Sequence, residues 1–285
     1  MSDSGAISGI DHVLVGVRDL EGAHETWQRL GFTLSPRGRH IGWGTANYCI
    51  MFPEDYIELL GILDPSQFTN NLDRFLETRE GLMGLAFATG DAEAAAARLA
   101  EAGIAADGPK DLARLLDLPE GEAKPAFRLV YPAAEATPDL SAFICHHLTP
   151  ELVRRPAWLE HANGALSIAA MTVAVEDPSA LALAYGKLFG YDRVRVADGV
   201  VAVQSGGAEI RFADARHLQR LQPGALDMPD YDCPWPIALR LRVSNIAKTG
   251  DALELGRVRF RYGGDEIVRV PASEACGVIL EFAES

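Results

Sequence analysis

One unit of sequence occurs four times along the 285-residue chain, and this repetition restricts the possible folds more than any other feature. Each unit starts with an apolar strand, continues with an amphipathic helix that ends at a glycine, and closes with short strand-like runs. The pattern predicts four βαβββ modules of the α+β class, paired two by two so that each open sheet is covered. The first strands begin near Ile10, Leu82, Leu166 and Ile237, and the helices end at Gly31, Gly103, Gly190 and Gly256.

The first two units also predict their individual elements. In the first unit, Asp19 can cap the helix, and Phe32–Leu34, Asn47–Phe52 and Tyr56–Leu63 are strand-like. In the second unit, residues 107–124 form an insertion, whose run Leu112–Leu118 predicts a short helix on a lid or a surface excursion.

A proline-containing, irregular stretch over residues 149–164 separates the second unit from the third. It predicts two domains, residues 1–162 with the first two modules and residues 163–285 with the last two.

Composition excludes several classes of partner. The net charge of -14 and the pI of about 4.9 disfavour binding to nucleic acid or to an anionic membrane. No secretory signal and no membrane-spanning apolar run is apparent. The four cysteines are far apart in sequence and form no CxxC pair, so we expect a reduced, cytoplasmic protein.

Several segments of the N-terminal half carry a family resemblance: Asp11–Val13, Val17–Leu20, Gly38–Asn47, Tyr56–Leu60 and, at the end of this half, residues 147–153 and 163–165. With these segments the N-terminal half resembles the glyoxalase-like domain proteins of the vicinal oxygen chelate superfamily, which includes glyoxalase I and the extradiol dioxygenases. The resemblance implies two cupped mixed β-sheets with helices outside, as in glyoxalases and dioxygenases, and a metal and substrate site in the N-terminal half.

Strand alternation then locates a candidate metal site. His12 in the first strand and Glu58 in the fourth can face the same cup, and a buried carboxylate needs a partner or a metal. When the modules are superposed on their helix-ending glycines, Gly84 takes the place of His12, and His146 falls at about the place of Glu58. We therefore predict His12, Glu58 and His146 as ligands of a divalent ion, which could be Zn, Ni, Mn or Fe.

The C-terminal half is predicted to be a degenerate copy. Met171 and Ile237 replace His12 there, and Glu281 is expected to be solvated or paired with an arginine. Around the N-terminal site we expect a substrate pocket, in which a bulge in the last strand would exchange the roles of the neighbours His146 and His147. The predicted substrate-binding residues are His40, Trp43, Asn47, Tyr56 and His147.

The functional prediction is a metal-dependent lyase or isomerase that acts on a small oxygen-chelating substrate. Two alternatives stay open: an extradiol-type dioxygenase with the same ligands, and a non-catalytic protein that sequesters a small molecule in an aromatic cup. A homodimer is also possible. The sequence determines neither the substrate nor the identity of the metal.

Overall fold

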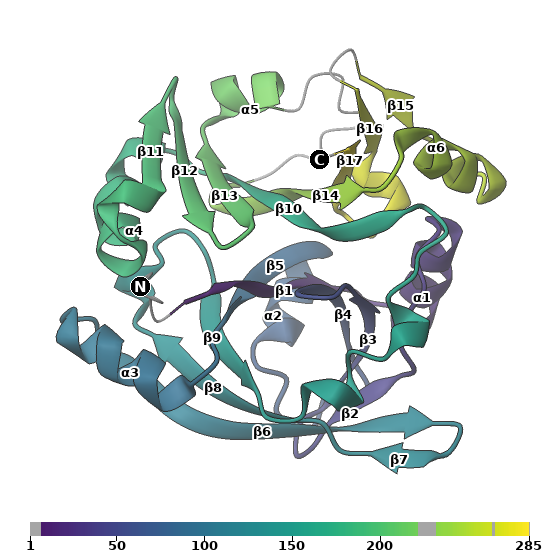
Figure 1. Cartoon of the computed structure of the whole chain (residues 1–285), viewed down its shortest axis with the longest axis horizontal. Helices are drawn as coiled ribbons and strands as arrows, with labels where there is room; N and C mark the ends of the chain where they lie inside the picture. Colours follow the sequence, from purple (N-terminus) through teal and green to yellow (C-terminus); the bar gives the residue numbers. More distant parts are fainter. Residues whose placement is uncertain (1–6, 222–231, 264–265, 285) are drawn as a thin grey trace.

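The computed structural model describes residues 7–221, 232–263 and 266–284 and contains two mixed β-sheets (Figure 1). Sheet A has the strand order β2-β3-β4-β1-β5-β9-β8-β6-β7, and sheet B has the order β11-β12-β13-β10-β14-β17-β16-β15. The strands of sheet A are β1 (Gly9–Gly16), β2 (Gly38–His40), β3 (Thr45–Met51), β4 (Tyr56–Ile62), β5 (Gly81–Ala88), β6 (Ala106–Leu118), β7 (Gly121–Ala123), β8 (Ala126–Pro132) and β9 (Ala142–His147). Those of sheet B are β10 (Ala165–Ala174), β11 (Val194–Ala197), β12 (Val200–Ser205), β13 (Ala208–Ala213), β14 (Trp235–Val243), β15 (Arg261–Tyr262), β16 (Ile267–Val270) and β17 (Ile279–Glu284).

The helices that follow the first strands lie on the outside of the sheets, whereas the short helix α2 (Leu72–Thr78) packs against Leu14 and Leu60 on the cup-facing side of sheet A (Figure 1). Each module contributes one of these outer helices, and Asp19 caps the first of them by accepting a hydrogen bond from the backbone of Gly22. No helix in the described ranges is long and apolar enough to cross a bilayer. The α-helices are α1 (Leu20–Arg29), α2 (Leu72–Thr78), α3 (Ala92–Glu101), α4 (Ala182–Phe189), α5 (Ala215–Leu221) and α6 (Ile246–Leu255), and short 3-10 turns occupy Ala134–Ala136, Pro150–Leu152, Pro156–Trp158, Pro178–Leu181, Tyr191–Arg193 and Ala272–Glu274.

The main hydrophobic core lies where the two sheets and their helices meet. Val13 and Val15 of β1 and Trp27 of α1 are fully buried in it, together with Val173 of β10 and Leu239 of β14. The opposite faces of the strands are therefore free to line the inside of each cup. This arrangement confirms the predicted α+β class with two cupped sheets and outer helices.

Sheet A curls into a barrel because β2 pairs with β6 as well as with β3 (Figure 1). The predicted helix at Leu112–Leu118 is wrong, because this run forms the second part of β6. The spacing of its leucines suits one face of a helix. In the strand that forms, every second side chain points to the same side, and Arg114 and Leu116 are the buried ones. Residues 32–34 also form no strand, and the outer strand of the first module is the shorter β2.

The stretch between the halves is hydrogen-bonded to the first module. His161 accepts a hydrogen bond from the backbone N–H of Thr33 and donates one to the carbonyl of Met51. Asn163 donates to the carbonyl of Leu30. The sheets divide near the predicted boundary, while the assignment of two separate domains stays a prediction from sequence.

Candidate metal and substrate site

A cavity opens inside the barrel of sheet A. One side of it carries the polar residues His12, His40, Glu58 and Arg114. Apart from the amide of Asn70, the rest of the wall is apolar and largely aromatic. It consists of Leu14, Trp43, Tyr56, Leu60, Asn70, Leu112, Phe127, Leu129, Tyr131, Phe143 and Cys145.

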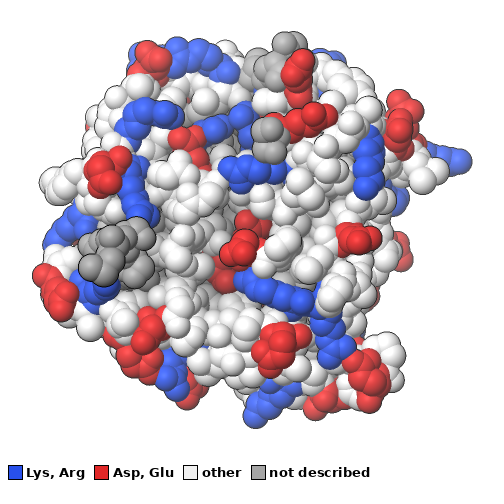
Figure 2. All heavy atoms as spheres, viewed as in Figure 1, with Lys and Arg blue, Asp and Glu red and all other residues white. Residues whose placement is uncertain are grey.

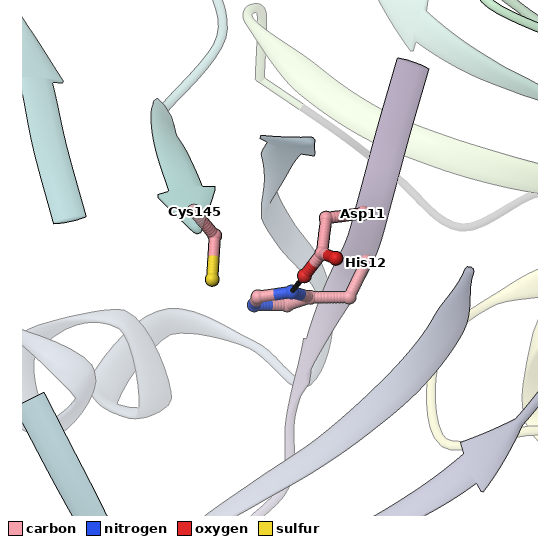
Figure 3. Close-up of side chains that lie close together, drawn as sticks. All are labelled: Asp11, His12 and Cys145. Carbon is pink, nitrogen blue, oxygen red and sulfur yellow. Dashed lines mark hydrogen bonds and ion pairs between the residues drawn. The ribbon is translucent and has the colours of Figure 1, made fainter. Parts of the chain in front are cut away.

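A bulge in β1 brings two neighbouring side chains to one side of the strand. Against β5, Ile10 pairs with Phe87 and His12 with Ala86, so Asp11 is the additional residue. Asp11 Oδ2 consequently lies 2.6 Å from His12 Nδ1, and the two side chains face Cys145 on β9 (Figure 3). An ionised carboxylate only accepts hydrogen bonds, so Nδ1 is the donor, and Nε2 of the neutral ring carries the lone pair.

Asp11 holds several groups in place. His147 Nε2 lies 3.0 Å from Asp11 Oδ2, and Arg154 lies 3.4 Å from Oδ1. Burial raises the pKa of Asp11, but the charge of His147 and hydrogen bonds from His12 and His147 lower this pKa more, so its net shift is downward. Because donors surround both carboxylate oxygens, we interpret Asp11 as the residue that orients His12, and not as a first choice of metal ligand.

Glu58 lies between two imidazole rings. His12 Nε2 is 3.5 Å from Glu58 Oε2, and His40 Nε2 is 3.7 Å from Oε1. Asn47 donates its side-chain amide to Oε1, and Thr45 Oγ1 lies 2.9 Å from the other ring nitrogen of His40. Burial raises the pKa of Glu58, but His12, His40 and Arg114 lower it more, which keeps this carboxyl group ionised.

The distances from Glu58 to His12 and to His40 are each compatible with two ligands of one divalent ion. The two nitrogen–oxygen distances exceed an ordinary hydrogen bond of about 2.7–3.2 Å. They are close to the separation of about 2.8–3.6 Å expected for neighbouring ligands that share one ion. Burial also lowers the pKa of His40, so its ring is neutral and can offer a lone pair. His12 and Glu58 are therefore the first candidates to hold a metal. His40 could join them only if its ring moved closer, because these three side chains do not form a group whose ligand atoms all lie within 4.8 Å of one another, as Asp11, His12 and Cys145 do.

The strand register does not place His146 in this set. In the first module, Leu14 of β1 pairs with Glu58 of β4. The residue of β5 that corresponds to Leu14 is Ala86, and it pairs with Phe143 of β9. Phe143 therefore takes the place of Glu58 in the second module. His146 lies on the opposite face of β9 from Phe143 and Cys145, near α3, where it interacts electrostatically with Asp91. The superposition of the modules on their helix-ending glycines had matched Glu58 with His146, which lies three residues after the true counterpart on β9, Phe143.

The other predicted site residues divide into two groups. Trp43 and Tyr56 line the cavity, and the ring of Tyr56 stacks on that of His12 at 4.4 Å between centroids. Asn47 and His147 are not among the cavity-lining residues, and they contact Glu58 and Asp11 respectively.

Three residues at the site were absent from the sequence prediction. Asp11 was missed because the bulge breaks strand alternation, and Arg114 because its strand was interpreted as a helix. Cys145 lies with Asp11 and His12 in a group whose ligand atoms fall within 4.8 Å of one another in the described part of the chain. Burial raises the pKa of the Cys145 thiol, so it is protonated in the absence of a metal.

The cup of sheet B has a different chemistry. Glu281 is fully buried between Arg240 and Arg269, at 3.0 and 2.9 Å, so of the two predicted states, solvated or paired with an arginine, the structure has the second. Met171 and Ile237 are fully buried apolar side chains. On the face of the molecule in Figure 2, acidic and basic side chains are interspersed, and no continuous basic surface is visible.

The comparisons with known proteins agree with this fold. The profile of the glyoxalase-like domain matches residues 10–189. A hypothetical protein from Staphylococcus aureus has a similar structure, with a TM-score of 0.68, 14% identity and coverage of 97% of this chain and 99% of the other. No curated protein matches the chain in sequence.

Two further solved structures share the fold. A triple mutant of 4-hydroxymandelate synthase from Streptomyces coelicolor has a TM-score of 0.60 at 13% identity, with 97% of this chain and 92% of the other covered. A fusion of a xylose isomerase-like TIM barrel with a 4-hydroxyphenylpyruvate dioxygenase has a TM-score of 0.58 at 14% identity, and the match covers 99% of this chain and 49% of the fusion protein.

The paired modules and the match to the glyoxalase-like domain place the chain in the vicinal oxygen chelate superfamily, which includes metal-dependent enzymes. Within that superfamily, the chain belongs to the family of the glyoxalase-like domain.

Proposed function

We propose that the protein is a metal-dependent enzyme that acts on a small oxygen-chelating molecule in the barrel of sheet A, by lyase or isomerase chemistry. The observation that carries the proposal is the position of Glu58 between the Nε2 atoms of His12 and His40. An ion of Zn, Ni, Mn or Fe would suit these ligands. When bound, the ion would act as a Lewis acid toward oxygen atoms of the substrate.

The residues of the chain have distinct roles in this proposal. Asp11 keeps the lone pair of His12 on Nε2, and Asn47 orients Glu58. The aromatic wall, which includes Tyr56 and Phe143, excludes water from the polar side of the cavity.

A second candidate is an extradiol-type dioxygenase. Two histidines and one carboxylate are the ligand set of many non-haem Fe(II) oxygenases, and His12, His40 and Glu58 have this composition. If the site instead binds no metal, the aromatic cavity would favour a protein that sequesters a small molecule. A small-molecule ligand, a homodimer and a cytoplasmic location remain predictions.

Titration of the metal-free protein with each ion in a calorimeter tests the proposal. We expect one site per chain, with affinity reduced at least tenfold in His12→Ala, Glu58→Gln and His40→Ala. His146→Ala is the matched control and should bind within twofold of the wild type, because this ring lies on the other face of β9. Any activity should follow metal content. A protein that binds none of these ions, or variants that all bind equally well, would leave the sequestering protein as the better proposal.

A further inference from the structure

Arg114 on β6 is a buried cation with few partners. Its side chain is 2% exposed, and NH1 donates to the sulfur of Cys49 at 3.2 Å. Among the described residues, Arg114 Nε is buried without a hydrogen-bond partner. No carboxylate oxygen of the described residues lies within 4.0 Å of a guanidinium nitrogen of Arg114. A buried charge is costly unless it is paired, so this arrangement suggests a missing anionic partner.

The guanidinium faces the same cavity as the candidate metal ligands. The backbone of Arg114 pairs with that of His40, and its side chain lines the cavity together with His12 and Glu58. The ring of Phe127 lies 5.5 Å from the guanidinium carbon. A small molecule in the cavity can therefore reach the Arg114 side chain and the His12–Glu58 pair at once.

The neighbouring groups do not neutralise Arg114 by contact. Glu58 acts on it only at longer range, and its oxygens are approached by Asn47, His12 and His40 instead. Burial raises the pKa of Cys49, so this thiol is a neutral acceptor. The cation is therefore available to a ligand.

The remaining wall indicates the shape of that ligand. Phe127, Tyr131, Phe143 and Trp43 surround the cavity, and Leu112 and Leu129 complete it. Such a wall binds an apolar or aromatic body, whereas a planar guanidinium binds a carboxylate through two parallel hydrogen bonds.

We propose that Arg114 binds the carboxylate of a substrate whose aromatic or apolar body lies against Phe127 and Phe143. This proposal rests on the proposed function only in calling the ligand a substrate. The carboxylate would fix the molecule in the cavity so that its reacting oxygens lie toward His12 and Glu58.

Matched acids and amides test the proposal directly. The probes are phenylacetate, benzoate and hexanoate, each compared with its neutral amide by calorimetry on the wild-type protein. At least one acid should bind ten times more tightly than its amide. Arg114→Gln, which can still donate to Cys49, should reduce that ratio to less than twofold, and Arg114→Lys should give an intermediate ratio because it keeps the charge without the planar pair of donors.

The wild-type comparison alone decides the question if Arg114→Gln does not fold. Equal binding of every acid and its amide would overturn the proposal, and so would an acid preference that persists in a folded Arg114→Gln protein. Repeating the comparison on chelator-treated protein separates this proposal from the function above. An acid preference without any metal binding would support the carboxylate site at Arg114 and contradict the proposed metal-dependent enzyme. Metal binding without an acid preference would support the metal-dependent enzyme and contradict the carboxylate site.

Discussion

Two buried aspartates near the ends of neighbouring strands should respond oppositely to the same substitution. Asp11 is surrounded by His12, His147 and Arg154, which favour its ionised form. Asp55 accepts hydrogen bonds from the backbone N–H of Ile168, and burial raises its pKa to about 7. Asp11→Asn therefore removes a charge that the site requires, while Asp55→Asn removes one that the fold disfavours.

The contacts give the expected size of both effects. A hydrogen bond to a charged group contributes about 1.5–3 kcal/mol and a neutral one about 0.5–1.5 kcal/mol. Asp11→Asn weakens the bonds from His12 and His147 and leaves Arg154 beside a neutral amide, so it should lower the free energy of unfolding by about 3 kcal/mol. Because it also loosens the orientation of His12, we expect metal affinity to fall about 10–100-fold.

For Asp55 the effect depends on pH. The native pKa of about 7 lies above the unfolded value of 3.8, so the native state binds the additional proton in this window. Stability is therefore lost as the pH rises from about 4 through about 7. Asp55→Asn avoids that loss and should be about 2–4 kcal/mol more stable than the wild type at pH 8, with the difference disappearing toward pH 4.

Urea unfolding at pH 8 and pH 5, with metal titration of each variant, measures these quantities. The reasoning is refuted if Asp11→Asn unfolds like the wild type and binds metal equally well. It is also refuted if Asp55→Asn is the less stable of the two variants at pH 8.

Two further predictions concern the linker and sheet B. Burial lowers the pKa of His161 from 6.5 to about 4, so the stability that its neutral ring provides is present above about pH 6.5 and is lost as the pH falls toward 4. His161→Gln should therefore destabilise the protein by about 2 kcal/mol more at pH 7 than at pH 5 in urea unfolding, and an effect independent of pH would contradict this. Glu281→Gln leaves the buried Arg269 beside a neutral group and should lower the free energy of unfolding by about 3 kcal/mol. Its metal content, measured by mass spectrometry, should be unchanged, and a loss of metal would show that sheet B holds a site.

The repeated pattern in the sequence was sufficient for the fold. Apolar alternation in the first strands and glycines at the helix ends recur in all four modules, and the structure has the same order of strand, helix and strands. The pair His12 and Glu58 was also predictable, because alternation along two regular strands determines which face each side chain occupies.

The rest of the site depends on pairing that a single sequence does not reveal. A one-residue bulge places Asp11 beside His12, and the register of β5 with β9 puts Phe143 where His146 had been predicted. Arg114 lies in a leucine-containing run whose spacing suits a helix as well as a strand, and only its pairing with β2 and β8 makes it part of the barrel.

The central claim is that one divalent ion binds in the barrel of sheet A. Anomalous diffraction from crystals soaked with Zn, Ni, Mn or Fe, recorded at the absorption edge of each metal, tests this most directly. We predict a single strong peak within about 2.0–2.2 Å of His12 Nε2 and Glu58, with His40 as the third protein ligand. A peak on Asp11 and Cys145, a peak in sheet B, or no peak at concentrations that saturate related metalloenzymes would contradict the account.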